Sequence, residues 1–147
     1  MIDDTDRKIL RLLQDNARIS NAEIARHVEL APSAVLKRIR RLEDDKVIMA
    51  YETRVDRHKV GLDISSFVLI STGEKPGTLE IGRKIAALPE VQDVHFTAGD
   101  FYYFAKVKTR NSREHNEFIK KLGQLGIVDC KTTLILDTIK ESFKLNI

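Results

Sequence analysis

The sequence predicts an α+β protein, with a helical N-terminal domain followed by a domain of alternating strands and helices. Apolar residues recur every three or four positions up to about residue 45, the period of amphipathic helices. From residue 61 onward, runs rich in β-branched and aromatic residues alternate with helical patterns. A connector containing Gly61 marks this change, so the predicted domains are residues 1–60 and 61–147.

Composition narrows the class of protein. The chain has 147 residues, of which 42% are hydrophobic, as in globular rather than disordered proteins. No apolar run approaches the roughly 20 residues that a membrane-spanning helix needs, and the acidic start does not resemble a signal peptide. The single cysteine, Cys130, fits a reducing compartment. We therefore expect a cytoplasmic protein with no membrane partner.

The N-terminal domain is expected to contain three helices and a short strand. The first helix runs from about residue 3 to residue 16. Ser20 and Glu23 form a capping box that opens the second helix. Pro32 opens the third helix, which runs to about Asp45. Residues 48–55 then have the pattern of a linker strand or wing.

The C-terminal domain is expected to fold as βαββαβ. The predicted strands are residues 64–72, 91–98, 101–109 and 128–139, and the predicted helices are residues 78–88 and 111–122. Gly99 and Asp100 form the tight turn of a hairpin, and Gly123 and Gly126 end the second helix. This order is typical of a split-βαβ sandwich of the ferredoxin-like type.

The third helix has the features of a DNA recognition helix. Its first residues are small, which allows close approach to a major groove, and residues 33–42 carry basic residues with no acid. Lys37 or Arg38 is expected to contact a base, and Arg40 and Arg41 to contact phosphates. The full set of predicted DNA-binding residues is Asn21, Pro32, Ser33, Ala34, Lys37, Arg38, Arg40 and Arg41. The alternative is a solvated basic face on an ordinary three-helix bundle.

Runs along nearly the whole chain also resemble the Lrp/AsnC family of feast/famine transcription regulators. The matching runs are residues 6–10, 18–25, 32–43, 88–91, 99–101 and 132–136. The resemblance implies a winged helix-turn-helix, then an αβ-sandwich for effector binding and oligomerisation. It also implies homodimers that assemble further, often to octamers, and an amino-acid effector bound between subunits of neighbouring dimers.

The sequence departs from the family pattern at both candidate sites. Ala31 precedes the helix-opening proline where the family often has serine, and alanine is a poor helix cap. In the hairpin, Phe101 and Tyr102 replace a tyrosine and an aspartate, and Ala98 replaces a threonine or serine. The identity of the effector therefore stays open, although Tyr102 favours an apolar or aromatic effector or fills the pocket itself.

The hairpin turn is the predicted effector site. Gly99 allows close approach of the backbone, Asp100 offers an acceptor to an ammonium group, and the last strand offers two hydroxyls. The predicted effector-binding residues are Ala98, Gly99, Asp100, Phe101, Tyr102, Thr132 and Thr133. Without the family resemblance, a plain turn is the simpler interpretation, since Gly-Asp is a common turn pair.

Two other classes of function compete with a DNA-binding regulator. An enzyme would need clustered acid, base and nucleophile groups, which the sequence lacks, and we expect no catalytic residues, cofactor or metal. The aromatic run 102–107 also suggests an RNA-binding sheet, but the spacing of that motif is absent and Tyr103 is expected in a core or interface. Because one recognition helix makes few base contacts, at least a dimer is expected. Its assembly surface is predicted on the β-rich half, around Val68 and Ile70.

Overall fold

The computed structural model describes residues 2–75 and 77–147 and divides into two compact units. One unit comprises Met1–Arg54 together with Glu141–Ile147, and the other comprises Val55–Lys140. This division differs from the predicted domains, because residues 55–60 group with the second unit and the C-terminal segment groups with the first. No helix of the described chain is long and apolar enough to cross a membrane.

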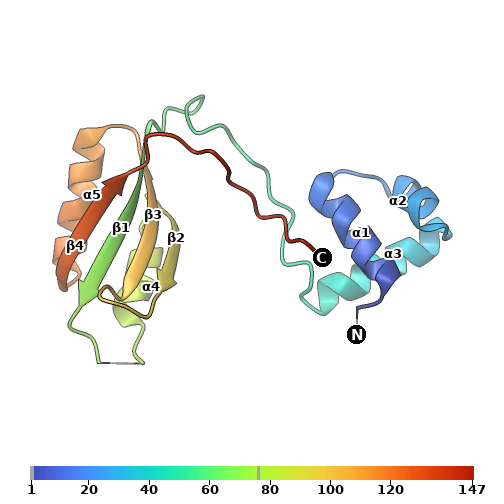
Figure 1. Cartoon of the computed structure of the whole chain (residues 1–147), viewed down its shortest axis with the longest axis horizontal. Coiled ribbons are helices and arrows are strands. Elements are labelled where there is room, and N and C mark those ends of the chain that lie inside the picture. Colours follow the sequence, from blue (N-terminus) through green and yellow to red (C-terminus); the bar gives the residue numbers. More distant parts are fainter. Residues whose placement is uncertain (1, 76) are drawn as a thin grey trace. The chain divides into compact units, whose positions relative to one another are not determined.

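The first unit is a bundle of the helices α1 (Asp4–Asp15), α2 (Asn21–Val28) and α3 (Pro32–Asp44) (Figure 1). Each helix is amphipathic and buries its apolar stripe against the other two. The resulting core contains Ile9, Ile24, Ala25, Val35 and Ile39.

Side-chain caps fix where α1 and α2 begin. The capping box of Ser20 and Glu23 is confirmed: Glu23 N–H donates to the Ser20 hydroxyl, and the Glu23 carboxylate accepts from Ser20 N–H at 3.1 Å. An equivalent box, Asp3 and Asp6, opens α1. Ala31 makes no side-chain cap on α3, as expected for alanine, and Pro32 begins that helix.

The predicted strand over residues 48–55 is not formed in the described chain. A strand needs a neighbouring edge for its backbone hydrogen bonds, and this unit otherwise consists of helices. The segment is instead tied to α3 by Tyr51, whose hydroxyl donates to Glu43 at 2.8 Å. Burial and this bond raise the pKa of Tyr51 to about 12.

The second unit has the predicted βαββαβ order. Its elements are β1 (Ile64–Thr72), α4 (Glu80–Ala86), β2 (Val91–Phe96), β3 (Tyr103–Thr109), α5 (Ser112–Gln124) and β4 (Ile127–Leu134). The sheet is four-stranded and antiparallel, in the order β2-β3-β1-β4. The strand order and the helices confirm the predicted fold class.

Helix α4 and the facing ends of β2 and β3 are two residues shorter at each differing end than predicted, and two further differences lie at α5 and β4. Gly123 lies inside α5 rather than ending it, and Gly126, with a φ of +80°, makes the turn into β4. Strand β4 ends at Leu134, five residues before the predicted Ile139, because β1 offers it no partner beyond Ser66 and Ser65.

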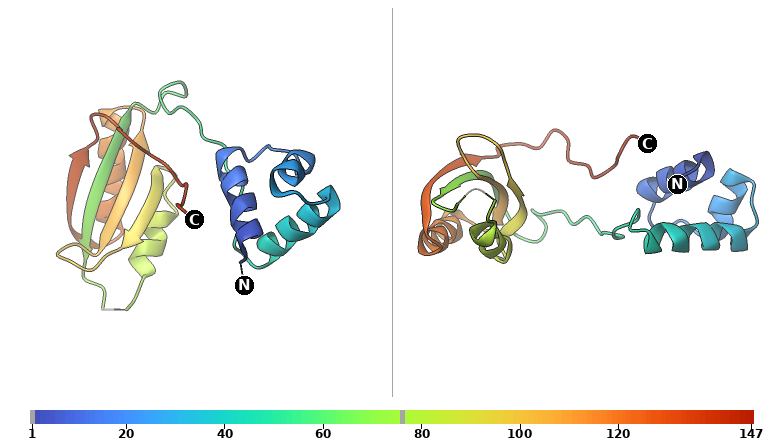
Figure 2. Two further views of the ribbon diagram at one scale, coloured as in Figure 1. Left: turned by 45° about the vertical axis from the view of Figure 1, so that its right-hand side comes forward. Right: turned by 90° about the horizontal axis from the view of Figure 1, so that it is seen from below.

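Helices α4 and α5 cover one face of the sheet and leave the other face open (Figure 2). Val68 and Ile70 lie under the helices and are fully buried, together with Phe118 of α5. The prediction that Val68 and Ile70 form an assembly surface is therefore wrong. Alternate residues of a strand face opposite sides, so Phe67 and Leu69 lie on the open face instead.

Candidate DNA-binding surface and effector loop

Helix α3 presents one apolar and one basic side. Val35, Ile39 and Leu42 are buried against the bundle, at the helical spacing that the sequence predicts. Lys37 and Arg40 are exposed, and neither side chain makes a hydrogen bond or ion pair with another described residue.

The N-terminal end of α3 is accessible. Pro32 and Ser33 are exposed and Ala34 is half-buried. Small side chains at this end let a helix approach the floor of a DNA groove closely. Asn21 stands apart from them at the first position of α2, where it is half-buried.

Arg38 and Arg41 differ from Lys37 because both pair with α1. Arg38 Nη1 lies 2.7 Å from Asp3 Oδ2 and 2.8 Å from Asp6 Oδ1, and Arg41 Nη2 lies 2.5 Å from Asp6 Oδ2. The hydrogen bond from Arg38 holds the pKa of Asp3 below its usual value, and the two carboxylates raise the pKa of Arg38. These four side chains connect the N-terminal end of α1 to the middle and last turn of α3.

This network makes Arg38 less available to DNA than Lys37. The Asp6 side chain has no exposed surface, whereas that of Arg38 is 28% exposed. To reach a base, Arg38 would leave a buried carboxylate short of one partner, which is costly. The base contact by Arg38 stays a prediction, and the geometry favours Lys37 for that role.

The sequence contained a signal for this network. Asp3 and Asp6 are three residues apart, as are Arg38 and Arg41, so each pair lies on one helix face. Complementary pairs of this kind on two packed helices indicate a bridge between them.

The β2–β3 loop, residues 97–102, is closed by Thr97. Thr97 N–H donates to the carbonyl of Tyr102, and its hydroxyl donates to the carbonyl of Phe101, both at 2.8 Å. Ala98, Gly99 and Asp100 project as an exposed tip. A Cβ built on Gly99 would meet no atom within 4 Å, so the backbone there is open to a ligand.

Aromatic rings flank this loop. Tyr102 stacks on Phe96, with ring centroids 6.3 Å apart and an interplanar angle of 8°. Both rings remain substantially exposed. The loop therefore presents an open backbone beside an apolar platform.

Thr132 and Thr133 are not brought to this loop within one chain. They lie on β4, opposite Val68 and Phe67 of β1, whereas the loop joins β2 and β3 at the end where β1 reaches Ile70. Strands β3 and β1 separate β2 from β4, at about 4.8 Å per strand. A ligand that touches both sets of residues would need two chains.

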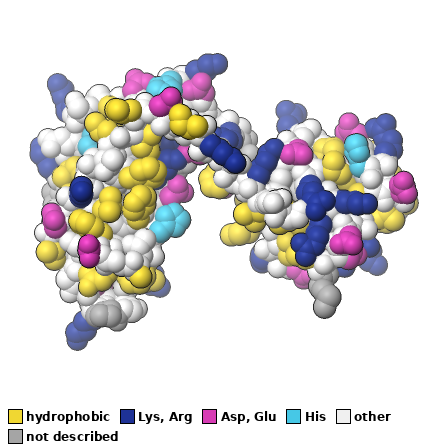
Figure 3. Space-filling view, in the orientation of Figure 1, with side chains coloured by type: hydrophobic (Ala, Val, Ile, Leu, Met, Phe, Trp, Pro, Cys, Tyr) yellow, Lys and Arg dark blue, Asp and Glu magenta, His cyan; other side chains and the backbone are white. Residues whose placement is uncertain are grey.

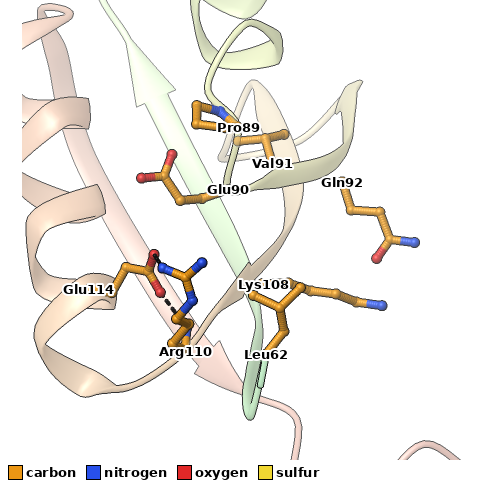
Figure 4. A pocket seen from close by; sticks show the side chains of 8 residues that line it. All are labelled: Leu62, Pro89, Glu90, Val91, Gln92, Lys108, Arg110 and Glu114. Carbon is orange, nitrogen blue, oxygen red and sulfur yellow. Dashed lines mark hydrogen bonds and ion pairs between the residues drawn. The ribbon is translucent and has the colours of Figure 1, made fainter. Parts of the chain in front are cut away.

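A pocket of about 430 Å³ lies at the opposite end of the sheet (Figure 4). Its lining residues are Leu62, Pro89, Glu90, Val91, Gln92, Lys108, Arg110 and Glu114. Arg110 and Glu114 pair across one side of it, 3.8 Å apart. None of the predicted effector residues lines this pocket.

Tyr103 lies in the core, under α4. Its hydroxyl donates to Glu74 at 2.9 Å, and its ring packs so closely on Gly82 that a Cβ there would lie 2.4 Å from Cε1. Although burial raises the pKa of Glu74, hydrogen bonds from Ile81 N–H, from Tyr103 and from Thr72 hold it below its usual value. A buried Tyr103 is not placed to stack on RNA bases, which weakens that alternative.

Among the described residues, no group of three or more His, Cys, Asp or Glu side chains is placed to hold a metal ion. Cys130 is half-buried and packs against the core, and burial raises the pKa of its thiol. His115 lies on α5 with its ring 6.1 Å from that of Phe118, and burial lowers its pKa.

Both units match known families. Residues 2–49 match the winged helix-turn-helix DNA-binding model, and residues 65–145 match the Lrp/AsnC ligand binding domain model. The chain is 33% identical to the HTH-type transcriptional regulator FL11 of Pyrococcus furiosus, over 99% of this chain and 96% of that protein. It is 31% identical to the leucine-responsive regulatory protein of Escherichia coli, over 98% of this chain and 90% of that protein.

Solved structures agree over the whole length. A transcriptional regulator of Neisseria meningitidis, in complex with L-methionine, superposes with a TM-score of 0.91 at 27% identity, covering 99% of this chain and 97% of that one. A feast or famine regulatory protein of M. tuberculosis, complexed with L-methionine, gives 0.92 at 26% identity and covers 99% of both chains. With a DNA-binding unit and a ligand-binding unit in this order, the chain belongs to the Lrp/AsnC family of transcription regulators.

Proposed function

We propose that this protein binds specific sites on duplex DNA through the exposed side of α3. The observation that carries the proposal is the N-terminal end of that helix, where small, accessible residues precede the exposed and unpaired Lys37. Ser33 and Ala34 allow the approach, and Lys37 contacts a base edge. Arg40 contacts a phosphate, and Arg41 shares its charge between phosphate and Asp6.

The proposed activity is binding to DNA that a small molecule regulates, and not catalysis. The chain acts on DNA in the cytoplasm, without a cofactor, and responds to a small molecule. Relatives named for transcription regulation support this reading.

We propose an amino acid as the effector, bound at the β2–β3 loop. Open backbone at Gly99 suits the carboxylate, Asp100 suits the ammonium group, and the rings of Tyr102 and Phe96 favour an apolar side chain. Two neighbours solved with L-methionine support this class of ligand. Because Thr132 and Thr133 lie two strands away, their hydroxyls reach the effector only from a second chain.

The open face of the sheet is the proposed dimer interface. Phe67 and Phe104 pack with ring centroids 5.0 Å apart on this face, beside Leu69. Hydrophobic side chains run along it in Figure 3. Two copies packed through these faces form a homodimer, and dimers assemble further, to an octamer or a similar ring, through the loops that hold the effector.

Genome-wide selection of bound DNA, with and without each of the twenty amino acids, tests the proposal. We expect one enriched motif with paired half-sites, and a changed profile with at least one amino acid. Recovery of fragments without a shared motif would contradict specific binding. An unchanged profile across all twenty would contradict the amino-acid effector while leaving DNA binding intact.

The same protein should be titrated with single-stranded RNA over a range of salt concentrations. RNA affinity equal to that for the selected duplex would favour the RNA-binding alternative.

A further inference from the structure

The C-terminal segment Glu141–Ile147 belongs to the same compact unit as α1, although it follows β4 in the chain. It meets one face of α1, formed by Arg11, Gln14 and Asp15. Gln14 and Asp15 lie three and four positions after Arg11, and each is therefore its neighbour on the helix surface. The family sequence pattern gave no indication of this contact.

Gln14 makes the central contact. Its Nε2 donates to the carbonyl of Leu145 at 3.2 Å, and its Oε1 accepts from Leu145 N–H at 2.6 Å. One side-chain amide thus satisfies both backbone groups of one residue, as a neighbouring strand would. Gln14 therefore recognises an extended main chain rather than a particular side chain.

Polar contacts on either side extend the docking. Lys144 Nζ lies 2.6 Å from Asp15 Oδ1, and Arg11 Nε donates to the carbonyl of Ile147. At the other end, Arg54 donates to the Glu141 carbonyl at 2.6 Å and pairs with its carboxylate at 3.3 Å. The contacts span the segment from its first residue to its last.

The docking leaves apolar side chains in water. Phe143 is 66% exposed and Leu145 is 70% exposed, so the segment is held by polar and backbone contacts instead of burial. Exposed contacts of this kind each stabilise weakly. A segment held in this way can detach without unfolding the helices beneath it.

We propose that the outer face of the last turns of α1 is a docking surface for the chain's own C-terminal segment, which acts as a detachable strap. The strap gives the DNA-binding unit a second chain connection to β4, besides the segment that follows α3. A DNA-binding unit that is joined by two chain segments samples fewer orientations than one joined by a single segment. This restriction raises its effective concentration at the second of two paired half-sites. This effect on DNA binding rests on the proposed function, whereas the docking itself does not.

Carbodiimide cross-linking of the full-length protein tests the docking. The reagent joins a carboxylate to an amine only where the two touch, so Asp15 and Lys144 should be linked. Glu117 and Lys120, paired at 2.8 Å within α5, serve as the internal positive control. Formation of the control link without the Asp15–Lys144 link would overturn the proposal.

Mixing ¹⁴N- and ¹⁵N-labelled protein before the reaction identifies the source of the segment. Linked peptides that carry a single label support a strap from the same chain. Linked peptides of mixed label would show a segment exchanged between copies and would overturn the assignment to the chain's own segment.

Gln14→Leu tests the effect on DNA, with Gln124→Leu in the last turn of α5 as the matched control. We expect Gln14→Leu to lower the Asp15–Lys144 link yield and to weaken binding to a selected two-half-site duplex severalfold. Binding to a single half-site should not change, and the control should change neither measurement. Equal losses on both duplexes, or no loss on either, would overturn the tethering role. Failure of the wild-type protein to bind DNA would instead count against the proposed function and would leave the cross-linking result standing.

Discussion

Asp6 holds α3 in place by accepting from two arginines while its own side chain is fully buried. Hydrogen bonds to charged groups stabilise proteins more than neutral ones do. Asp6→Ala should therefore destabilise the helical unit by about 2–3 kcal/mol, since Arg38 and Arg41 can still turn to water. Urea denaturation followed by helix circular dichroism would measure the loss.

Asp4→Ala is the control for this prediction, because Asp4 lies in the same first turn and is exposed. It should cost clearly less than Asp6→Ala. Equal losses for the two variants would mean that the network contributes nothing beyond the effect of acidic residues on the helix dipole.

Gly82 is required by the ring of Tyr103. An added Cβ would lie 2.4 Å from Cε1 and 2.8 Å from Cζ, and the ring cannot move away easily because its hydroxyl is bound to Glu74. Gly82→Ala should lower the stability of the second unit by about 1–3 kcal/mol through overpacking. Thermal unfolding of the full chain would measure it.

Gly123→Ala is the control for Gly82→Ala, and we do not expect it to lower the stability of the second unit. Gly123 also lies in a helix, but a Cβ there would meet nothing within 4 Å. Its replacement should be neutral or stabilising by up to about 1 kcal/mol. The same melting temperature for both alanine variants would contradict the role given to the Tyr103 contact.

Among the elements, helix α5 carries a half-buried titratable side chain, His115, whose two ring nitrogens are buried. Neither ring nitrogen of His115 has a hydrogen-bond partner among the described residues, and burial lowers its pKa from the ordinary 6.5. Below pH 6.5 His115 binds a proton in the unfolded chain more readily than in the folded chain. The free energy of unfolding is therefore highest above that pH and decreases as the pH falls. We expect the stability of the second unit to decrease from pH 7 toward pH 5.

His115→Leu should reduce this acid-dependent loss, because no proton is then taken up on unfolding. Chemical denaturation at several pH values would compare the two slopes. His95→Leu is the control, since His95 is exposed on β2. Identical pH slopes for His115→Leu and the wild type would contradict the assignment.

Local chemistry explains which elements the sequence could predict. Ser20, Glu23 and Pro32 act within one turn of chain, and they placed α2 and α3 correctly. Which alternate residues of β1 are buried depends on the face of the sheet that α4 and α5 cover. That packing involves residues far apart in the chain, so the sequence assigned Val68 and Ile70 to the wrong face. The prediction of a strand over residues 48–55 was wrong for a similar reason. A strand forms only where a neighbouring strand edge accepts its backbone hydrogen bonds, and the local sequence does not show whether such an edge is present.

The geometry of the candidate sites likewise depends on packing between residues that are distant in the sequence. Basic residues of α3 were visible in the sequence, but the pairing of Arg38 with Asp3 and Asp6 depends on how two helices pack. Strand order likewise decides that Thr133 and Gly99 lie apart.

At the scale of the whole molecule, assembly is expected to depend on the open face of the sheet. Leu69→Glu would put a charge between two packed faces and should shift the protein toward monomer in sedimentation at micromolar concentration. Lys84→Glu, at an exposed position on α4, is the control and should leave assembly unchanged. An unaltered dimer with Leu69→Glu would exclude this face as the interface.

If α3 reads DNA sequence, Lys37→Ala should lose affinity for a selected duplex far more than for a scrambled one, both measured at fixed salt. We expect a loss of about 1–3 kcal/mol on the selected duplex and a much smaller loss on the scrambled one. Arg40→Ala, as a phosphate contact, should weaken both duplexes alike. Unchanged affinities for both variants on both duplexes would contradict the claim.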